Sequence, residues 1–307
     1  MSSRGVLMAI FNFLRDAKLY IVHDNKQYNI DIANVSFNQT FTENSFSVKT
    51  LHTQQMFEGS VINRANPANF EFEMPAIRES DLQIALSLLL SASPCDLYIQ
   101  STNKIFKLTY AVFTNGLFGI EKLKELNISF SGEATRLTEV GVVGSYTIPG
   151  VVQARSAERT YNQTLYLSVL LNGSEISPHT YQVSAEYQNQ IDWVPWATVN
   201  GALTAQNADT SMYPQTFVVR TKIFAGSIGQ YITDGNSGAL QNWDTSASLR
   251  IKAGQEVGSS FYGFDFNLAS CSFTNRMDPT EVFTQSFDWR MNYNPASLTD
   301  VIKYVTL

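Results

Sequence analysis

The chain has 307 residues, of which 44% are hydrophobic and only 16% are charged, and its formal net charge is −6. That length is enough for about two domains, each able to bury a core. Because the balance is acidic and no run of Lys or Arg occurs in the sequence, these numbers argue against a protein that captures nucleic acid by neutralising phosphates.

The N-terminal stretch contains a short apolar run, Val6 to Leu14, which is interrupted by Asn12. The run is too short to span a bilayer, and it lacks the small-residue cleavage site of a signal peptide. We expect it to form an apolar arm that docks on its own domain or on a neighbouring subunit. No other stretch of the sequence is apolar enough to cross a membrane.

Alternation of apolar and polar residues, with many β-branched and aromatic side chains, predicts strands through most of the first half. The predicted strands cover residues 18–23, 28–32, 35–41, 45–50, 69–74, 96–100, 104–113 and 123–132. One segment, residues 77–93, breaks this pattern and predicts a helix, with Ser80 as its N-cap, Asp81 in its first turn and Pro94 after its end.

A stretch of Gly, Pro and small polar residues follows the first set of strands and predicts a linker. Beyond it the alternation predicts strands over residues 164–170, 179–187, 197–205, 216–224, 246–252, 260–270 and 281–293. The sequence therefore predicts a first β domain over residues 1–143, a linker over 144–158 and a second β domain over 159–307.

Three landmarks recur in the same order in the two halves, which indicates a duplicated unit. They are Leu19 with Leu165 at an offset of 146 residues, Phe70 with Phe217 at 147, and Leu137 with Leu298 at 161. The offset increases after Phe217, in a region whose Gly-rich stretch, residues 225–244, stands where the first half has its helix.

No pattern of a known catalytic or metal site occurs in the sequence, and we expect neither enzymatic activity nor a cofactor or metal. The three histidines, His23, His52 and His179, lack the spacing of a zinc site. Cys95 and Cys271 lie far apart with no second cysteine nearby, and they do not occupy matching positions in the two halves. We expect buried, unpaired thiols.

Two other groups of side chains admit a binding role. Glu71 and Glu73 project from the same face of one predicted strand, beside each other rather than across a cleft as glycoside hydrolysis requires. Trp193, Trp196 and Trp243 support a carbohydrate-binding β-sandwich as an alternative, but tryptophan is equally suited to anchor a protein–protein contact.

The order of predicted elements resembles the tail tube proteins of long-tailed bacteriophages. A strand pair leads through a long polar loop, Thr50–Pro67, to an FEFE strand at residues 70–73, one helix, and a β-meander that ends in GEATRLTEV at residues 132–140. Related tube domains occur in contractile tails and type VI secretion needles, and some phages fuse two such domains. The resemblance implies an all-β dominated fold, a duplicated tail-tube domain in which each β-sandwich or barrel has one flanking helix.

The resemblance also implies a structural subunit of the phage tail tube, located in the virion and assembled in the host cytoplasm. Sheets of neighbouring domains would join edge to edge, in stacked rings around a channel through which DNA passes without being gripped. Such domains surround the channel six at a time, so three fused chains would close one ring. Expected partners are further copies of the chain, tape-measure, baseplate and terminator proteins, and a sheath where the tail has one. A baseplate or tail-terminator adaptor of the same fold is the alternative.

Two sets of residues are candidate assembly sites. The polar loop is longer than a hairpin turn requires, so we expect it to bridge to the next ring, with Met56 and Phe57 as apolar anchors beside Gln54 and Gln55. At the offset of 147 residues Glu73 aligns with Arg220, so equivalent positions carry opposite charge. We expect these two residues to meet at the seam between domains and to specify its register.

Overall fold

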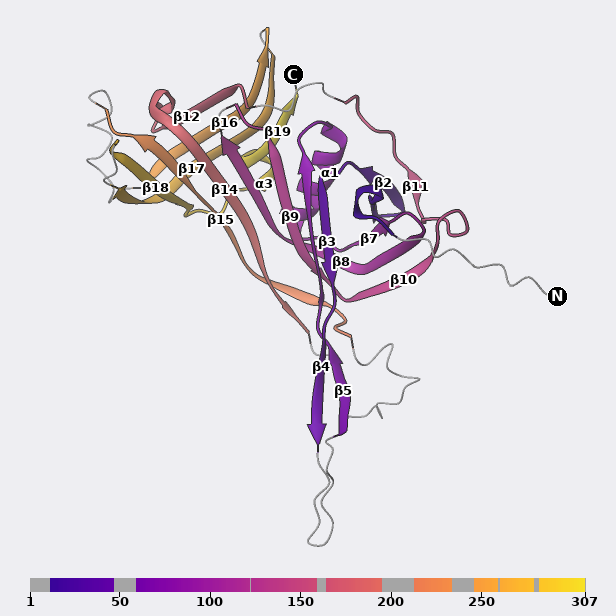
Figure 1. Cartoon of the computed structure of the whole chain (residues 1–307). Coiled ribbons are helices and arrows are strands. Elements are labelled where there is room, and N and C mark those ends of the chain that lie inside the picture. The colour runs from indigo at the N-terminus through magenta and orange to yellow at the C-terminus, as the bar shows by residue number, and fades with distance from the viewer. Residues whose placement is uncertain are drawn as a thin grey trace, which may run out of the picture.

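The computed structural model of the chain describes residues 12–46, 59–121, 123–158, 164–194, 213–233, 246–258, 260–278 and 282–306. Strands make up most of these residues, and helices are few (Figure 1). The all-β dominated fold that the alternation predicts is confirmed.

The described part of the first half contains one α-helix, a short 3-10 turn and ten strands, and the linker adds an eleventh strand. Their bounds are η1 (Leu14–Asp16), β1 (Lys18–His23), β2 (Lys26–Ile30), β3 (Asn34–Asn38), β4 (Phe41–Phe46), β5 (Gly59–Ala65), β6 (Ala68–Pro75), α1 (Glu79–Ser91), β7 (Cys95–Gln100), β8 (Lys104–Glu121), β9 (Asn127–Ala134), β10 (Arg136–Val142) and β11 (Val151–Val152).

The described part of the second half is again mostly strands. Its elements are β12 (Tyr166–Leu171), β13 (Ser174–Glu175), η2 (Ser177–His179), β14 (Thr180–Trp193), β15 (Phe217–Tyr231), β16 (Ala247–Val257), β17 (Ser260–Asp278), β18 (Thr284–Met291), α3 (Leu298–Val301) and β19 (Ile302–Thr306). The α-helix described here is the four-residue α3, so a long flanking helix is seen in the first half alone. Residues 234–245, which follow β15 as α1 follows β6, lie outside the described residues, as does the predicted strand at 197–205.

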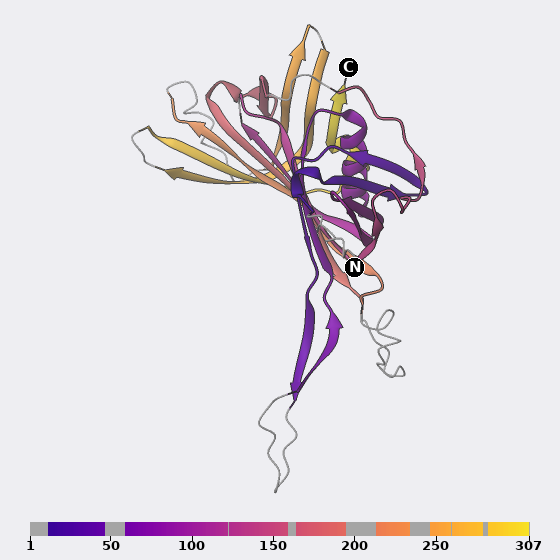
Figure 2. The same cartoon turned by 45° about the vertical axis from the view of Figure 1, so that its right-hand side comes forward.

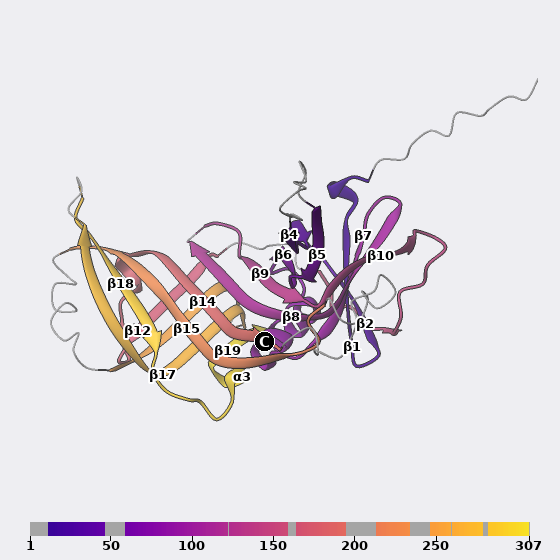
Figure 3. The ribbon, with the colours of Figure 1, turned by 90° about the horizontal axis from the view of Figure 1, so that it is seen from below.

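One antiparallel sheet runs through both halves (Figure 3). Its strands follow the order β3, β6, β9, β8, β14, β15, β18 and β17, four from each half. Successive side chains of a strand point to opposite faces. Strand β6 accordingly buries Phe70 and Phe72 on one face and turns Glu71 and Glu73 to the other, as the FEFE pattern predicts.

The apolar face of this sheet packs against α1 and a second layer of strands. Strand β8 serves both layers, because residues 104–111 pair with β7 and β10 while residues 112–121 pair with β9 and β14. Helix α1 contacts β8 and β2, and it also meets α3 and β19 of the second half. Phe72 packs edge-on against Phe113, at 5.8 Å between ring centroids, within one core that contains residues of both halves.

The strand pairings of the first half recur in the second. Strand β8 pairs with β7, β9 and β10 as β17 pairs with β16, β18 and β19. Strand β6 pairs with β3 and β9 as β15 pairs with β14 and β18. Strand β1 pairs with β2 and β7 as β12 pairs with β13 and β16.

A register shift at the same place in both halves shows which residues correspond. The ladder of β7 with β8 shifts directly after Cys95, and the ladder of β16 with β17 shifts directly after Ala247. Cys95 lies opposite Ala111, and Ala247 lies opposite Cys271, so the cysteine and the alanine have exchanged strands. Both thiols are buried and unpaired, as the sequence predicts, and burial raises the pKa of each above its ordinary value.

A second exchange involves an aromatic residue and a glycine. Phe70 of β6 lies opposite Gly132 of β9, while Gly226 of β15 lies opposite Trp289 of β18. In each pair the aromatic ring covers the glycine, since a Cβ on Gly132 would lie 2.4 Å from the Phe70 ring and one on Gly226 would lie 2.6 Å from the Trp289 ring. Counted from the common register shift, Phe70 therefore corresponds to Gly226 and not to Phe217.

The ladders also replace the other residue matches inferred from the sequence. Leu19 lies opposite Ile99 as Val169 lies opposite Ile251, so its counterpart is Val169 and not Leu165. The LTEV motif, from residue 137, lies in β10, whereas the LTDV motif, from residue 298, forms α3. The repeated letters therefore occupy different structures.

Helix α1 begins without the side-chain cap that the sequence predicts. Its N-cap residue is Arg78, and Ser80 lies in the first turn. The amide of Ser80 donates to the Ser156 hydroxyl at 3.1 Å, and the amide of Ser156 donates to the Ser80 hydroxyl at 3.1 Å. The linker therefore supplies the hydrogen bond that an N-cap side chain would otherwise make.

Strands β4 and β5 form a separate two-stranded arm that projects beyond the body of the molecule (Figures 1 and 2). The predicted polar loop Thr50–Pro67 is therefore shorter than expected, because its residues from Gly59 onward pair as β5 with β4. Residues 47–58 lie outside the described residues.

Replacement of Gly132 by alanine is expected to destabilise the protein. The new Cβ would lie 2.2 Å from the carbonyl oxygen of Val112 as well as against the Phe70 ring, and backbone cannot yield as a flexible side chain can. Overpacking of this kind costs about 1–3 kcal/mol. The control is Gly119→Ala on β8, where nothing lies within 4 Å of the added methyl. Equal thermal midpoints for the two variants would contradict the close packing at Gly132.

Candidate functional site

The face of the eight-stranded sheet opposite the apolar core is polar and acidic. Residues that share a rung share a face, which places Glu71 with Ser131, Asp288 with Thr274, and their neighbours on one side. Among the described side chains of this face the acidic ones are Glu71, Glu73, Glu121, Glu133, Glu186, Asp192 and Asp288, and the basic ones are Arg220, Arg276 and Arg290. We call this surface the polar face.

Neutral side chains hold several of these carboxylates. The Nδ2 of Asn127 donates to Glu73 at 3.0 Å, and the Nδ2 of Asn115 donates to Glu186 at 2.8 Å. An amide donor orients a carboxylate without cancelling its charge. The polar face therefore keeps an excess of negative charge together with many uncharged hydrogen-bonding groups.

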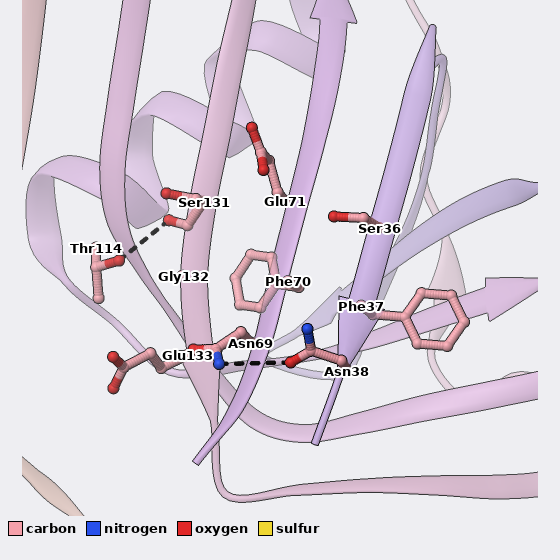
Figure 4. A pocket seen from close by; sticks show the side chains of 10 residues that line it. All are labelled: Ser36, Phe37, Asn38, Asn69, Phe70, Glu71, Thr114, Ser131, Gly132 and Glu133. Carbon is pink, nitrogen blue, oxygen red and sulfur yellow. Dashed lines mark hydrogen bonds between the residues drawn. The ribbon is translucent and has the colours of Figure 1, made fainter. Parts of the chain in front are cut away.

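A shallow hollow of about 350 Å³ lies on the polar face, over Gly132 (Figure 4). The Nδ2 of Asn69 donates to the Oδ1 of Asn38 at 3.5 Å along its floor, and Glu71 and Glu133 are its two carboxylates. Its lining residues are Ser36, Phe37, Asn38, Asn69, Phe70, Glu71, Thr114, Ser131, Gly132 and Glu133. This set contains no histidine, cysteine or lysine to act as a base or nucleophile beside the carboxylates. The hollow can accept hydrogen bonds from a polar surface.

The two halves join within this sheet through the ladder of β8 with β14. Residues 115–121 of β8 pair with residues 182–188 of β14. On the apolar side Phe118 of β8 packs against Phe264 and Phe266 of the second half, with ring centroids 5.3 and 5.1 Å away. This internal seam is therefore both hydrogen-bonded and apolar.

Side chains of the second half also cap the C-terminal end of α1. The Nδ2 of Asn189 donates to the carbonyl oxygens of Leu89, at 2.6 Å, and of Phe113, at 3.0 Å. The Nζ of Lys222 donates to the carbonyl oxygen of Leu90 at 2.7 Å, and burial lowers the pKa of this lysine. A cation is favoured at this end of a helix, where carbonyl groups have no intrahelical partner.

The densest cluster of ionised side chains binds the linker to the other end of α1. Arg155 contacts Asp81 at 2.6 Å and Asp31 at 2.7 Å, while Arg78 contacts Asp31 at 2.7 Å and Glu158 at 2.6 Å. Burial alone would raise the pKa of Asp31, but hydrogen bonds and charge from Arg155 and Arg78 outweigh it and lower that pKa. We call this cluster the linker latch; every ionised group in it has a partner of opposite charge, which indicates a structural role.

The sequence matches the Bacteriophage Baseplate Tube Protein Family over residues 9–304. The chain belongs to this family. Membership makes it a structural protein of the phage tail and baseplate, and so a component of the virion. No individually curated protein matches the chain.

The predicted ring-stacking residues of this baseplate tube family member lie outside the described residues. They are Gln54, Gln55, Met56 and Phe57. Glu73 and Arg220 are described, and neither lies in the ladder that joins the halves. Arg220 pairs with Asp192 of the neighbouring strand. The ladders match Glu73 with Gly229 and not with Arg220, so equivalent positions do not carry opposite charges. A contact between Glu73 of one copy and Arg220 of another stays an untested prediction.

Among the tryptophans, Trp193 donates its indole N–H to Glu133 across the two halves and packs edge-on against Phe217 at 5.5 Å. Trp196 and Trp243 lie outside the described residues, as does His52. His23 contacts the carbonyl of Pro94 at 3.1 Å, and His179 contacts the Thr233 hydroxyl at 3.2 Å.

Within the described ranges, no three His, Cys, Asp or Glu side chains come close enough to hold a metal ion. None of the helices described there is long and apolar enough to cross a bilayer. The sequence did not predict the linker latch or the capping of α1 by Asn189. The partners of Arg155 and Asn189 lie about 75 to 125 positions away along the chain, so no local sequence pattern indicates these contacts.

Replacement of Arg155 by methionine is expected to destabilise the protein by up to about 3–5 kcal/mol, because Asp81 would keep a buried charge without its cation. The exposed Arg15, paired with Asp16 at 3.8 Å, provides the control Arg15→Met. Because the pKa of Asp31 is lowered in the folded state, its share of the stabilisation is present above about pH 4 and is lost as the pH falls further. Urea titrations at neutral pH and near pH 3 test this. A loss of the same size at both pH values would contradict the ionic role of Arg155.

Proposed function

We propose that this protein forms the wall of a ring around a channel for DNA in the phage tail, with the polar face lining the channel. The observation that carries the proposal is the eight-stranded sheet, whose apolar face is covered by the rest of the chain and whose other face carries ordered carboxylates and amides. A sheet with one packed face and one wet face is suited to form the wall of a water-filled channel.

Three chains close the ring in this proposal. Each half of the chain provides four strands with the same pairings, so that the two halves act as two wall units of a duplicated domain. Six wall units then give true threefold and approximate sixfold symmetry. Closure of the ring leaves no lateral edge free, so that growth proceeds by axial stacking.

The charge of the polar face suits passage of DNA without retention. Binding to DNA rests largely on cations that neutralise phosphates and release counterions. The described part of the polar face offers more carboxylates than guanidinium groups, so it repels the phosphates while amide and hydroxyl groups keep the wall hydrated.

The arm formed by β4 and β5 is the proposed contact between stacked rings, since it projects beyond the sheet (Figure 2). The predicted anchors Met56 and Phe57 belong to the segment between these two strands. Further proposed partners are tape-measure, baseplate and terminator proteins, and a sheath where the tail has one, with assembly in the host cytoplasm.

A tube subunit and a baseplate adaptor ring are two versions of this function. The description of the matching family names the baseplate, which favours a ring at that end of the tail. The number of copies per purified particle distinguishes them, because a long tube contains many rings and an adaptor contains one.

Electron microscopy of the purified protein tests the ring. We expect rings with a central hole and threefold symmetry, and native mass spectrometry should give a mass of three chains. Six chains around the hole, or a face other than the polar face turned to the channel, would contradict the proposal.

Exchange of two exposed carboxylates of the polar face for lysine is expected to make assembled rings retain double-stranded DNA. The variant is Glu71→Lys with Asp288→Lys, and its affinity should fall with salt, with a log–log slope of about −0.9 for each phosphate contacted. The control, Glu256→Lys with Asp300→Lys, makes the same change in net charge at exposed sites off the polar face. Fluorescence anisotropy over a salt series measures both. Equal retention by the two variants would mean that net charge, and not the polar face, governs the contact.

A further inference from the structure

The internal seam provides a template for contact between two copies. We propose that the outer edge of β17 in one chain forms an antiparallel ladder with the outer edge of β3 in the next, in the register of β8 with β14. The partner is a second copy of this chain, and the inference rests on the proposed ring.

Both edges lack a strand partner within the described part of the chain. Strand β3 pairs there with β6 alone. Beyond its pairing with β16, strand β17 pairs over residues 271–278 with β18 alone. They are the two ends of the eight-stranded sheet, and open edges of this kind invite another strand.

The repeated ladders translate the internal seam into a specific register. Strand β14 corresponds to β3, with Ala185 in the place of Phe37. Strand β8 corresponds to β17, and β8 has one extra residue, Thr114, at its register shift. With that residue left out of the count, Phe118 takes the place of Met277. Because Phe118 lies opposite Ala185, Met277 of one copy will lie opposite Phe37 of the next.

Apolar side chains at the β17 edge are exposed where their counterparts at the seam are buried. Phe118 is 0% exposed, whereas Met277 is 54% exposed. Leu126, which follows β8, is 4% exposed, whereas its counterpart Phe283 is 59% exposed. The second half packs against Phe118 within the chain, and a next copy would cover Met277 in the same way.

The receiving edge has a matching apolar lining. Phe118 rests on Phe266, whose counterpart in the first half is Phe106. Phe37 and Phe106 lie together with ring centroids 5.4 Å apart, so that Met277 would meet two aromatic rings, a favourable contact for its sulfur.

A cavity of about 290 Å³ lies beside β3 and has room for residues of the next copy. Its lining includes Leu14, Ala17, Ile32 and Val35. At the internal seam the corresponding position is occupied by main-chain hydrogen bonds. The amide of Leu123 donates to the carbonyl oxygen of Thr164, and the amide of Thr164 donates to the carbonyl oxygen of Lys124, each at 2.9 Å. Leu14 stands at the place of Thr164, because each lies five residues before the matched residues Leu19 and Val169. The cavity is therefore where Phe283 of the next copy would dock, the first matched apolar residue described after β17.

Charges across the proposed ladder are complementary. Arg276 would lie opposite Asn38, which lines the hollow that contains Glu71 and Glu133. The guanidinium group of one copy thus approaches two carboxylates of the next, which favours this order of halves over pairing of like ends.

Disulfide trapping in the full-length protein tests the register. One matched pair is Phe37→Cys with Met277→Cys, and the neighbouring rung is Asn38→Cys with Arg276→Cys. Two adjacent rungs are used because antiparallel rungs alternate between wide and narrow spacing. The native Cys95 and Cys271 are buried, and burial raises the pKa of both thiols, so they compete little.

The control is Asn38→Cys with Thr274→Cys, which lies two residues out of register. Its Cα atoms would be about 7–8 Å apart, beyond the usual span of a disulfide. We expect covalent trimers from at least one matched pair on non-reducing gels after mild oxidation, and little or none from the control or from single variants. Asn38 and Arg276 lie on the polar face, so this pair leaves the core intact.

Microscopy of the same samples separates the two levels of inference. Threefold rings in which the control pair is trapped better than both matched pairs would overturn the register and leave the ring standing. Absence of both rings and covalent oligomers would overturn the proposed function together with the ladder.

Discussion

Pairing between β8 and β14 makes the two halves of this chain one sheet, and most other features depend on it. The pairing aligns four strands of each half into eight, gives the sheet one continuous apolar face, and brings Phe118 against the aromatic residues of the second half. It also places Asn189 and Lys222 where they cap α1. Without this ladder the polar face would be two separate surfaces, and the helix would end in unsatisfied carbonyl groups.

The remaining contacts between the halves support the same arrangement from outside the sheet. The linker latch holds residues 155–158 on the start of α1, and the hydroxyl of Tyr304 donates to the carbonyl oxygen of Ala76 at 3.3 Å. Helix α1 is thus fixed at its start by the linker and at its end by β14 and β15. In the proposed ring each chain then behaves as one rigid pair of wall units.

Period-2 alternation in the sequence predicts most of the described strands, and the run of residues 77–93 predicts α1, because these patterns depend on neighbours along the chain. Strands β5, β11, β13 and β19 were not predicted. The alignment of the halves was not predictable in the same way. Identical letters such as LTEV and LTDV fall in a strand and a helix, while true counterparts such as Phe70 and Gly226 share no chemistry. Register is set by partner strands far away in the sequence and by hairpins of different length, so it emerges only from the ladders.

The exchanged rungs show that these core positions are constrained as pairs. Each rung combines one aromatic side chain with one glycine, and the aromatic residue stands on the opposite strand in the two halves. The rungs are Phe70 with Gly132 and Gly226 with Trp289. A lineage cannot pass from one arrangement to the other by a single substitution without loss. Two glycines leave a void in the core, and two bulky residues collide, each at a cost of a few kcal/mol. Each position is therefore constrained by its partner across the rung, and the size of one side chain sets the size that the other can have.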